Sequence, residues 1–280
     1  MALIAVTGGK GGTGKSTVAC SLAYELGKRN NVLLVDADVD CPNDHLILSI
    51  KRKKVKDVTT FLPKLDPKKC IACGSCAKAC RANAIVSVPG KKPIFVEQQC
   101  IGCKACMLVC PTKAISESRR KIGSIYAGKK GKIEFFGAEL LPGFEESSPV
   151  VNELKKVAMK KASKYKYIII DTAAGTHCNV ISALLGCDFA LAVTEPTPLG
   201  KHDLELILEL LSILHIRAGI VINRSDIADA KLIDESAKHF NVPIIARIPY
   251  SKSIEENYAK GRPIENKAIK KLASFLEASL

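Results

Sequence analysis

Short apolar runs alternate with longer segments in which apolar residues recur at helical spacing, and this pattern extends over most of the chain. The apolar runs are continuous, as expected for parallel strands that are buried on both faces. They predict strands at 3–6, 31–36, 132–136, 167–171, 189–194, 218–222 and 242–248. The periodic segments predict helices at 16–28, 150–163, 200–215 and 227–240, and two more helices after residue 248. The predicted fold class is therefore α/β with a mostly parallel sheet.

The alternation stops between residues 63 and 117. This segment holds two cysteine-rich runs and two short predicted strands, 85–88 and 94–96, on either side of a Pro-Gly turn. We therefore predict two domains. Residues 1–62 and 118–280 form one discontinuous domain, and residues 63–117 form a small α+β domain inserted into it.

A glycine-rich loop follows the first predicted strand and precedes the first predicted helix. Its residues are Gly9, Lys10, Gly11, Gly12, Thr13, Gly14, Lys15, Ser16 and Thr17. The spacing fits the phosphate-binding loop of P-loop NTPases. Glycines allow positive φ and turn backbone N–H groups toward phosphate oxygens, and the helix N-terminus adds partial positive charge. We expect Lys15 to reach the β- and γ-phosphates and the Ser16 hydroxyl to bind Mg²⁺.

Two of the predicted strands end in carboxylates. The second strand ends at Asp36, with Asp38 two residues beyond, and the strand 167–171 ends at Asp171. Ligands of such sheets bind at the carboxyl ends of the strands. We expect Asp171 in the water shell of Mg²⁺, with Asp36 near it, and Gly175 to let the following loop bend. The alternative for the acidic turn after Asp36 is a capped turn with no ligand.

Eight of the twelve cysteines form two runs with identical spacing, thirty residues apart. The runs are Cys70, Cys73, Cys76 and Cys80, and Cys100, Cys103, Cys106 and Cys110. Flanking residues repeat at the same offset, such as Ile71 with Ile101 and Ala84 with Ala114. This spacing is typical of [4Fe–4S] ligands, whereas zinc ribbons use pairs and disulfides would need a secretory context.

The two runs together resemble a bacterial two-cluster ferredoxin. In that arrangement three cysteines of one run hold a cluster and the fourth cysteine ligates the other cluster. The resemblance implies one [4Fe–4S] cluster on Cys70, Cys73, Cys76 and Cys110, and a second on Cys100, Cys103, Cys106 and Cys80. The chain departs from the pattern at Arg81, where proline is common after the fourth cysteine.

The second lysine of the loop, Lys10, gives a deviant Walker A sequence that resembles that of the MinD/ParA/Mrp ATPases and the nitrogenase iron protein. The resemblance covers nearly the whole chain. It implies that ATP, with Mg²⁺, is bound and hydrolysed in a homodimer that encloses the nucleotides. In such a dimer Lys10 reaches the partner's nucleotide, Lys15 neutralises phosphate charge and Asp38 positions the attacking water.

The same resemblance implies where the nucleotide base binds. Asn223 and Arg224, at the end of a predicted strand, match the adenine contact of the family, and Pro249 opens the loop that closes over the base. ATP and ADP are thus the expected nucleotides.

The remaining cysteines have less specific surroundings. Cys20 and Cys187 are expected to be buried apolar residues. Cys178 lies seven residues beyond Asp171 and has two interpretations: a buried helix-cap residue, or a ligand of a cluster shared between subunits, as in the nitrogenase iron protein. The second would need two cysteines in each subunit, and no cysteine lies between Cys110 and Asp171.

The formal net charge is +14. We expect a solvated, lysine-rich surface, and the alternatives are contacts with nucleic acid or acidic lipid. Nucleic acid is not favoured, because aromatic residues are few and are not interleaved with the basic runs at 51–56 and 119–132. The run at 51–56 is interpreted as solvated surface or as a docking site for an acidic partner, and the stretch at 119–132 as the return into the larger domain.

The apolar runs are too short for a membrane span, and no secretory leader is evident. We therefore expect a cytoplasmic protein with no transmembrane segment. The C-terminal segment at 269–276 is amphipathic. In MinD such a tail binds a membrane, but here we expect the segment to pack on the rest of the protein.

Three functions are compatible with these features. The first is an ATPase whose nucleotide state controls electron transfer to a redox partner. The second is an assembly or carrier protein for iron–sulfur clusters or another metallocofactor. The third is a MinD-like positioning protein with structural clusters. Eight cysteines with ferredoxin spacing favour permanent clusters, and hence the first.

Overall fold

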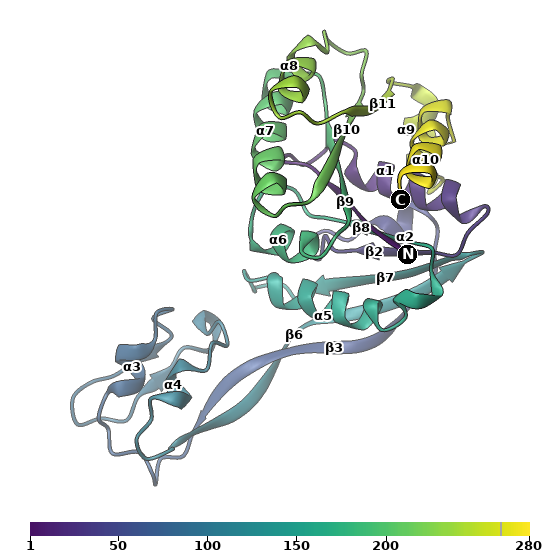
Figure 1. Ribbon diagram of the computed structural model, residues 1–280. Coiled ribbons are helices and arrows are strands. Elements are labelled where there is room, and N and C mark those ends of the chain that lie inside the picture. The colour runs from purple at the N-terminus through teal and green to yellow at the C-terminus, as the bar shows by residue number, and fades with distance from the viewer. Residues whose placement is uncertain (264) are drawn as a thin grey trace. The chain divides into compact units, whose positions relative to one another are not determined.

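The computed structural model describes residues 1–263 and 265–280, which divide into two compact units (Figure 1). Unit 1 comprises Met1–Lys56, Ile125–Glu139 and Ser147–Leu280. Unit 2 comprises Asp57–Ser124 and Leu140–Glu146. Unit 2 thus extends beyond the predicted 63–117 at both ends and includes a second, separate segment.

Strands and helices alternate through most of unit 1. The strands of the chain are β1 Ala2–Thr7, β2 Val32–Asp36, β3 Arg52–Leu65, β4 Ile85–Val86, β5 Ile94–Phe95, β6 Ile115–Lys130, β7 Ile133–Leu140, β8 Tyr167–Asp171, β9 Phe189–Thr194, β10 Arg217–Asn223 and β11 Ile244–Ile248. The α-helices are α1 Lys15–Gly27, α2 Asp44–Ile47, α3 Ser75–Ala79, α4 Ala105–Leu108, α5 Ser148–Met159, α6 Cys178–Leu184, α7 Pro198–Ile213, α8 Lys231–His239, α9 Lys252–Ala259 and α10 Lys267–Ser279. Short 3₁₀ turns lie at Glu97–Gln99 and Ala162–Lys164.

The main sheet of the described residues has the strand order β11-β10-β9-β1-β8-β2-β7-β6-β3. The strands from β11 to β7 in this order pair in parallel, which confirms the predicted α/β class. In this register the carboxyl ends of β1, β2 and β8 meet, since Val6 pairs with Asp171 and Asp36 pairs with Asp171. Strand order alone therefore brings the glycine-rich loop to both predicted carboxylates.

Helices lie on both faces of the parallel strands of this sheet (Figure 1). Ile4 and Val6 of β1 belong to a hydrophobic cluster with α1 and α10. The alternate residues of the strand, Leu3 and Ala5, are also buried, and α6 and α7 pack on this side of β1 and β9. Burial on both faces explains why the strands are continuous apolar runs.

The C-terminal helix α10 packs on the core, as predicted. Its apolar side chains Ile269, Leu272 and Leu276 are fully buried against α1 and the sheet. No helix among the described residues combines the length and the apolar character that crossing a membrane requires.

Two long strands, β3 and β6, were not predicted. They coincide with the two basic runs, and residues 53–57 are exposed. A lysine-rich strand at the end of a sheet does not show the apolar pattern of a buried strand, and lysines are common on such edges. Within the run at 51–56, Lys56 contacts Glu153 at 2.5 Å and Arg52 contacts Glu139. The solvated-surface interpretation of this run thus agrees with its exposure.

Unit 2 is built around two short helices, α3 and α4, and a small antiparallel pair of strands. In that pair Ile85 of β4 lies opposite Phe95 of β5, in agreement with the predicted short strands around the Pro-Gly turn. The hydrophobic cluster of this unit is small: its buried members are Phe61, Cys76, Ile85, Cys106 and Ile115.

Candidate functional site

The glycine-rich loop joins β1 to α1 and is shaped by backbone that only glycine adopts easily. Gly12 and Gly14 have φ values of 82° and 93°. Gly14 directly precedes α1, and a β-carbon there would collide with the side chain of Asn223. The Asn223 amide donates a hydrogen bond to the carbonyl oxygen of Thr13 at 2.9 Å. The end of β10 is thereby fixed to the loop.

Lys15 is buried inside this loop, with 6% of its surface exposed. Its ammonium group donates a hydrogen bond to the carbonyl oxygen of Lys10 at 2.8 Å. Burial lowers the pKa of Lys15, and the charges of Asp171 and Asp38 oppose this shift. Among the residues that the structure describes, this carbonyl is the one hydrogen-bond partner of the ammonium group, which is therefore suited to bind an anion that enters the loop.

Three buried carboxyl groups meet beside the loop. Oxygen atoms of Asp36, Asp44 and Asp171 lie within 4.8 Å of one another. Burial is the main reason that the pKa of Asp171 rises to about 7, and burial also raises the pKa values of Asp36 and Asp44 well above their usual range. Carboxylates this close repel one another unless a proton or a cation lies between them.

The surroundings of Asp171 fit a divalent cation. Neither of its carboxyl oxygens receives a hydrogen bond of ordinary geometry from the residues that the structure describes. The Ser16 hydroxyl is nevertheless close to this carboxyl group. Its proximity lowers the pKa of Asp171, whereas burial raises it. Oxygen ligands short of hydrogen-bond donors suit Mg²⁺, so Ser16 and Asp171 fit the site predicted for it.

Asp44 was not identified from the sequence. Its side-chain oxygen Oδ1 accepts a hydrogen bond from the Cys20 thiol at 3.1 Å, and its backbone N–H donates to Asp36 at 3.1 Å. It lies in the short helix α2, within a polar turn where no apolar pattern indicates burial. The contact also accounts for Cys20, which is fully buried as predicted.

One cavity of about 460 Å³ gathers most of the predicted nucleotide residues. The predicted residues that line this cavity are Gly11, Gly12, Gly14, Lys15, Ser16, Thr17, Asp38, Asn223, Arg224 and Pro249. The predicted residues outside the lining are Gly9, Lys10, Thr13 and Asp171. Gly9 instead packs against Asp203, and Thr13 is buried.

Asp38 and Arg224 are both constrained by neighbours. The Asp38 carboxyl accepts a hydrogen bond from the backbone N–H of Cys41 at 3.3 Å, and partial burial raises its pKa. Arg224 has a positive φ of 49° and an ion pair with Glu195 at 2.5 Å. The Arg224 guanidinium is thus held in place before any ligand binds.

The loop and helix after β11 add cavity residues that sequence reasoning missed. Tyr250, Ile254 and Tyr258 line the same cavity, and the Tyr250 hydroxyl donates to Glu255 at 2.9 Å. Two tyrosines in a chain with 5% aromatic residues were the available signal. A planar base can stack on such rings.

Cys178 is exposed at the first position of α6, so the prediction that it is buried was wrong. The next residue, Asn179, donates a hydrogen bond from its side chain to Asp40 at 3.3 Å. This contact places the start of α6 beside the turn that carries Cys41, which is also exposed. Cys187, by contrast, is buried as predicted.

In unit 2 the eight repeated cysteines sort into two cavities. One is lined by Cys70, Cys73, Cys76 and Cys110, and the other by Cys80, Cys100, Cys103 and Cys106. Each cavity therefore combines three cysteines of one run with the fourth cysteine of the other run. This is the crossed grouping that the ferredoxin resemblance implies.

The backbone of unit 2 repeats with the same offset of thirty as the sequence. Positive φ values occur at Ala72 and Gly102, at Gly74 and Lys104, and at Asn83 and Lys113. The fourth cysteine of each run also accepts an equivalent hydrogen bond. The N–H of Ala84 donates to the Cys80 sulfur at 3.3 Å, and the N–H of Ala114 donates to the Cys110 sulfur at 3.2 Å.

The thiols within each cavity are too far apart for one zinc ion. Four thiolates around a tetrahedral zinc lie about 3.8 Å from one another, given a Zn–S bond of about 2.3 Å. Among the described residues, the one group of three or more such ligands within 4.8 Å is the aspartate triad, and no cysteines form one. Burial and the neighbouring thiolates of Cys100 and Cys103 raise the pKa of Cys106 to about 11, so a bound cation would be needed to hold it as a thiolate.

Comparison with known proteins adds independent information. The family model of the CobQ/CobB/MinD/ParA nucleotide binding domain matches residues 4–264. An uncharacterized protein of Methanocaldococcus jannaschii is 36% identical over 93% of this chain and 90% of its own length. The crystal structure of the cell division ATPase MinD of Pyrococcus furiosus has a TM-score of 0.63 and 24% identity, and it covers 100% of this chain and 99% of its own.

MinD of Pyrococcus horikoshii, solved with Mg-ADP, has the same TM-score of 0.63 at 21% identity and covers 99% of this chain and 96% of its own. At this level of identity the solved structures support the fold alone. The family model, which spans most of the chain, decides the family. The chain belongs to the CobQ/CobB/MinD/ParA family of nucleotide-binding domains.

Proposed function

We propose that the chain is a Mg²⁺-dependent ATPase that holds two [4Fe–4S] clusters in unit 2 and couples the nucleotide state of a homodimer to electron transfer. One observation carries the proposal: eight cysteines sort into two cavities of four in the crossed pattern of a two-cluster ferredoxin. They do so in a chain whose other unit has a phosphate-binding loop beside a buried carboxyl cluster.

The ATPase part of the proposal rests on unit 1. Lys15 binds the phosphates, Ser16 and Asp171 hold Mg²⁺, and Asp38, which lines the same cavity, positions the attacking water. Two similar proteins are described as a cell division ATPase and as a complex with Mg-ADP, which supports this assignment. Lys10 is proposed to reach the nucleotide of the partner subunit.

The base is proposed to lie between the end of β10 and the loop after β11. Asn223, Arg224 and Pro249 line that side of the cavity, together with Tyr250 and Tyr258. The Asn223 side chain contacts the phosphate loop through the Thr13 carbonyl. Asn223 is therefore expected to contact the base and, through Thr13, the phosphate-binding loop.

The cluster part of the proposal rests on how the thiols are held. Cys76 and Cys106 are buried in the small core of unit 2, and the Cys80 and Cys110 sulfurs receive backbone hydrogen bonds. Such hydrogen bonds stabilise thiolate ligands and tune a reduction potential. When bound, [4Fe–4S] clusters supply one-electron carriers of low potential. Ligands that form part of the core favour resident clusters over cargo, and therefore electron transfer over cluster delivery.

The first test is the iron and sulfide content of anaerobically reconstituted protein, together with its ATPase rate. We expect about eight irons per chain for two cubane clusters. Cys76→Ser is expected to lose about half of them, and Cys178→Ala, which changes an exposed thiol of unit 1, is the matched control that loses none. A Cys76→Ser variant that keeps all its iron would contradict the ligand assignment.

The ATPase part is tested in the same preparation. Lys15→Ala should lower the Mg²⁺-dependent rate by about a hundredfold or more, because it removes a charge on the phosphates. Lys28→Ala, just after the far end of α1, is the control with the same charge change and should keep the rate. Equal rates in both variants would contradict the role of Lys15.

A further inference from the structure

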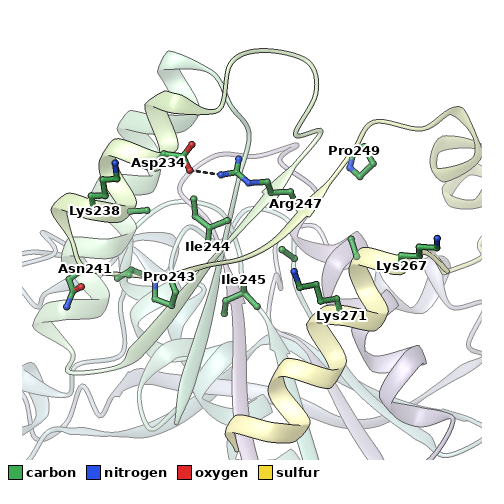
Figure 2. Close-up of a pocket in the computed structure, with 14 residues that line it drawn as sticks. Asp234, Lys238, Asn241, Pro243, Ile244, Ile245, Arg247, Pro249, Lys267 and Lys271 are labelled. Atoms are coloured by element: carbon green, nitrogen blue, oxygen red, sulfur yellow. Dashed lines mark hydrogen bonds and ion pairs between the residues drawn. The ribbon is translucent and has the colours of Figure 1, made fainter.

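The strand β11 ends the main sheet and borders an open groove of about 960 Å³ (Figure 2). The strand forms the floor of the groove, with α8 on one side and α10 on the other. The groove is separate from the nucleotide cavity, although Pro249 lines both.

Within the described residues, β11 pairs with another strand along one edge. That edge faces β10, where for example the N–H of Ile220 donates to the Pro243 carbonyl and the N–H of Ser225 donates to the Ile248 carbonyl. No strand within the described part of the chain pairs with the other edge. Free N–H and C=O groups along a strand are a template for the addition of another strand.

The floor of the groove is apolar. Ile244 and Val242 are partly exposed in it, and Ile245 and Ala246 pack beneath. An added strand would place alternate side chains over this surface and over the flanking helices. Partly exposed aliphatic side chains on an unpaired edge favour a bound polypeptide.

The walls of the groove are cationic. Lys238 of α8, Lys267 and Lys271 of α10 and Arg247 of β11 line it, against a single carboxylate, Asp234. Arg247 pairs with Asp234 at 2.5 Å, as Figure 2 shows. None of the three lysines forms an ion pair with a residue that the structure describes. In Figure 2 the Lys271 side chain points toward β11.

Charge decides which occupant suits this edge. A second copy of the chain, paired edge to edge about a two-fold axis, would place these lysines opposite the same lysines, which is unfavourable. An acidic segment would neutralise them. The groove offers no aromatic side chain for stacking bases, so nucleic acid is disfavoured.

We propose that the free edge of β11 binds an extended acidic segment of a partner protein as an additional strand. Pairing gives the segment main-chain hydrogen bonds, and its acidic side chains meet Lys238, Lys267 and Lys271. The proposal goes beyond the nucleotide and cluster chemistry and does not depend on either. Because Pro249 lines both the groove and the nucleotide cavity, a bound segment would contact the loop that borders the nucleotide.

The probe is a fluorescein-labelled peptide of about ten residues in which Glu and Val alternate, a pattern suited to a strand. Its binding to the holoprotein is measured by fluorescence anisotropy, and hydrogen exchange of the β11 amides is followed in parallel. We expect saturable binding with slower exchange at residues 244–248. A peptide with Lys in place of Glu, and one with Pro in place of every Val, should bind at least tenfold more weakly.

The variant Lys267→Glu with Lys271→Glu should weaken binding about tenfold, because two exposed ion pairs become repulsions. The control is Lys270→Glu, which makes the same charge change per residue on the same helix but outside the groove and should keep the affinity. Failure of the Glu-Val peptide to bind would overturn the proposal. So would binding without protection of the β11 amides, equal binding of the proline peptide, or preferential binding of a single-stranded oligonucleotide.

Discussion

The carboxyl cluster of unit 1 and the cysteine cavities of unit 2 are supported by very different hydrophobic cores. The Asp36–Asp171 region lies at the ends of strands whose apolar residues are buried on both faces and packed against α1 and α10. Unit 2 has a cluster of five buried residues, two of which are the cysteines Cys76 and Cys106. We therefore expect unit 1 to form its site before a ligand arrives, and unit 2 to need the proposed metal ligation to complete its core.

The largest expected effect follows from this difference. Removal of iron and sulfide should unfold unit 2 while unit 1 keeps its fold and its nucleotide binding. The free energy that metal ligation adds to a small domain is on the order of 10 kcal/mol, which is as large as the whole net stability of a typical domain, so its loss is expected to unfold this small unit. Limited proteolysis checks this prediction: the cluster-free protein should be cleaved between residues 57 and 124. Equal protease resistance with and without clusters would contradict it.

The next effect concerns catalysis in unit 1 alone. Asp38→Asn keeps the size of the side chain but removes the carboxylate that is proposed to position water. We expect the rate of ATP hydrolysis to fall by about a hundredfold or more while ATP still binds. Hydrolysis rates and nucleotide affinity measured side by side check this, and the iron content should not change. A loss of affinity with an unchanged maximal rate would assign Asp38 to binding instead.

The third prediction uses the pH dependence of the carboxyl cluster. The pKa of Asp171 is raised to about 7 in the folded protein, and those of Asp36 and Asp44 are raised well above their usual range, so the native state holds more protons than the unfolded state between about pH 4 and 7. The free energy of unfolding of Mg²⁺-free protein should therefore fall as the pH rises through this window, by on the order of 2 kcal/mol between pH 5.5 and 7.

Denaturant unfolding of unit 1 at several pH values measures this slope. Asp44→Asn removes one of the three carboxyls and should reduce it, and Mg-ADP should reduce it further, because a cation replaces the shared proton. Asp229→Asn serves as the control. It removes an exposed carboxyl group that is distant in sequence from the three aspartates. A slope that is the same in the Asp44 variant would show that the cluster does not control it.

The smallest expected effect is in unit 2. Arg81 stands after Cys80, where Pro111 follows Cys110 in the other run, and its side chain is exposed. A charge in this position would shift the potential of the nearby cluster by on the order of 20 mV at most, because water screens it. Redox titration of Arg81→Pro checks the shift. If the substitution leaves the potential unchanged, the charge of Arg81 does not influence the nearby cluster.

The sequence predicted the site where its chemistry depends on local spacing. The phosphate loop, the carboxylates at strand ends and the two cysteine runs are contiguous patterns, and the strands of the parallel sheet are buried runs. It failed where tertiary context decides. Asp44 is buried only because α2 folds beneath Cys20, and Tyr258 reaches the cavity only because α9 lies beside it.

The missed strands have a different cause. The residues of β3 that hold the basic run are exposed at the end of the sheet, so their sequence shows charge instead of apolar alternation. Cys178 was expected to be a buried helix-cap residue, but its side chain at the first position of α6 is exposed, whereas Val180 in the same turn is buried. In both cases exposure, which the local pattern does not encode, determined the outcome.

The most direct test of the central claim measures the midpoint potentials of the clusters by anaerobic EPR titration with and without Mg-ATP, with apo-ferredoxin present as an acceptor for iron. If the nucleotide state controls electron transfer, Mg-ATP will shift at least one potential while about eight irons per chain stay in place. Transfer of iron and sulfide to the apo-ferredoxin, with no shift in potential, would contradict it and identify the protein as a cluster carrier.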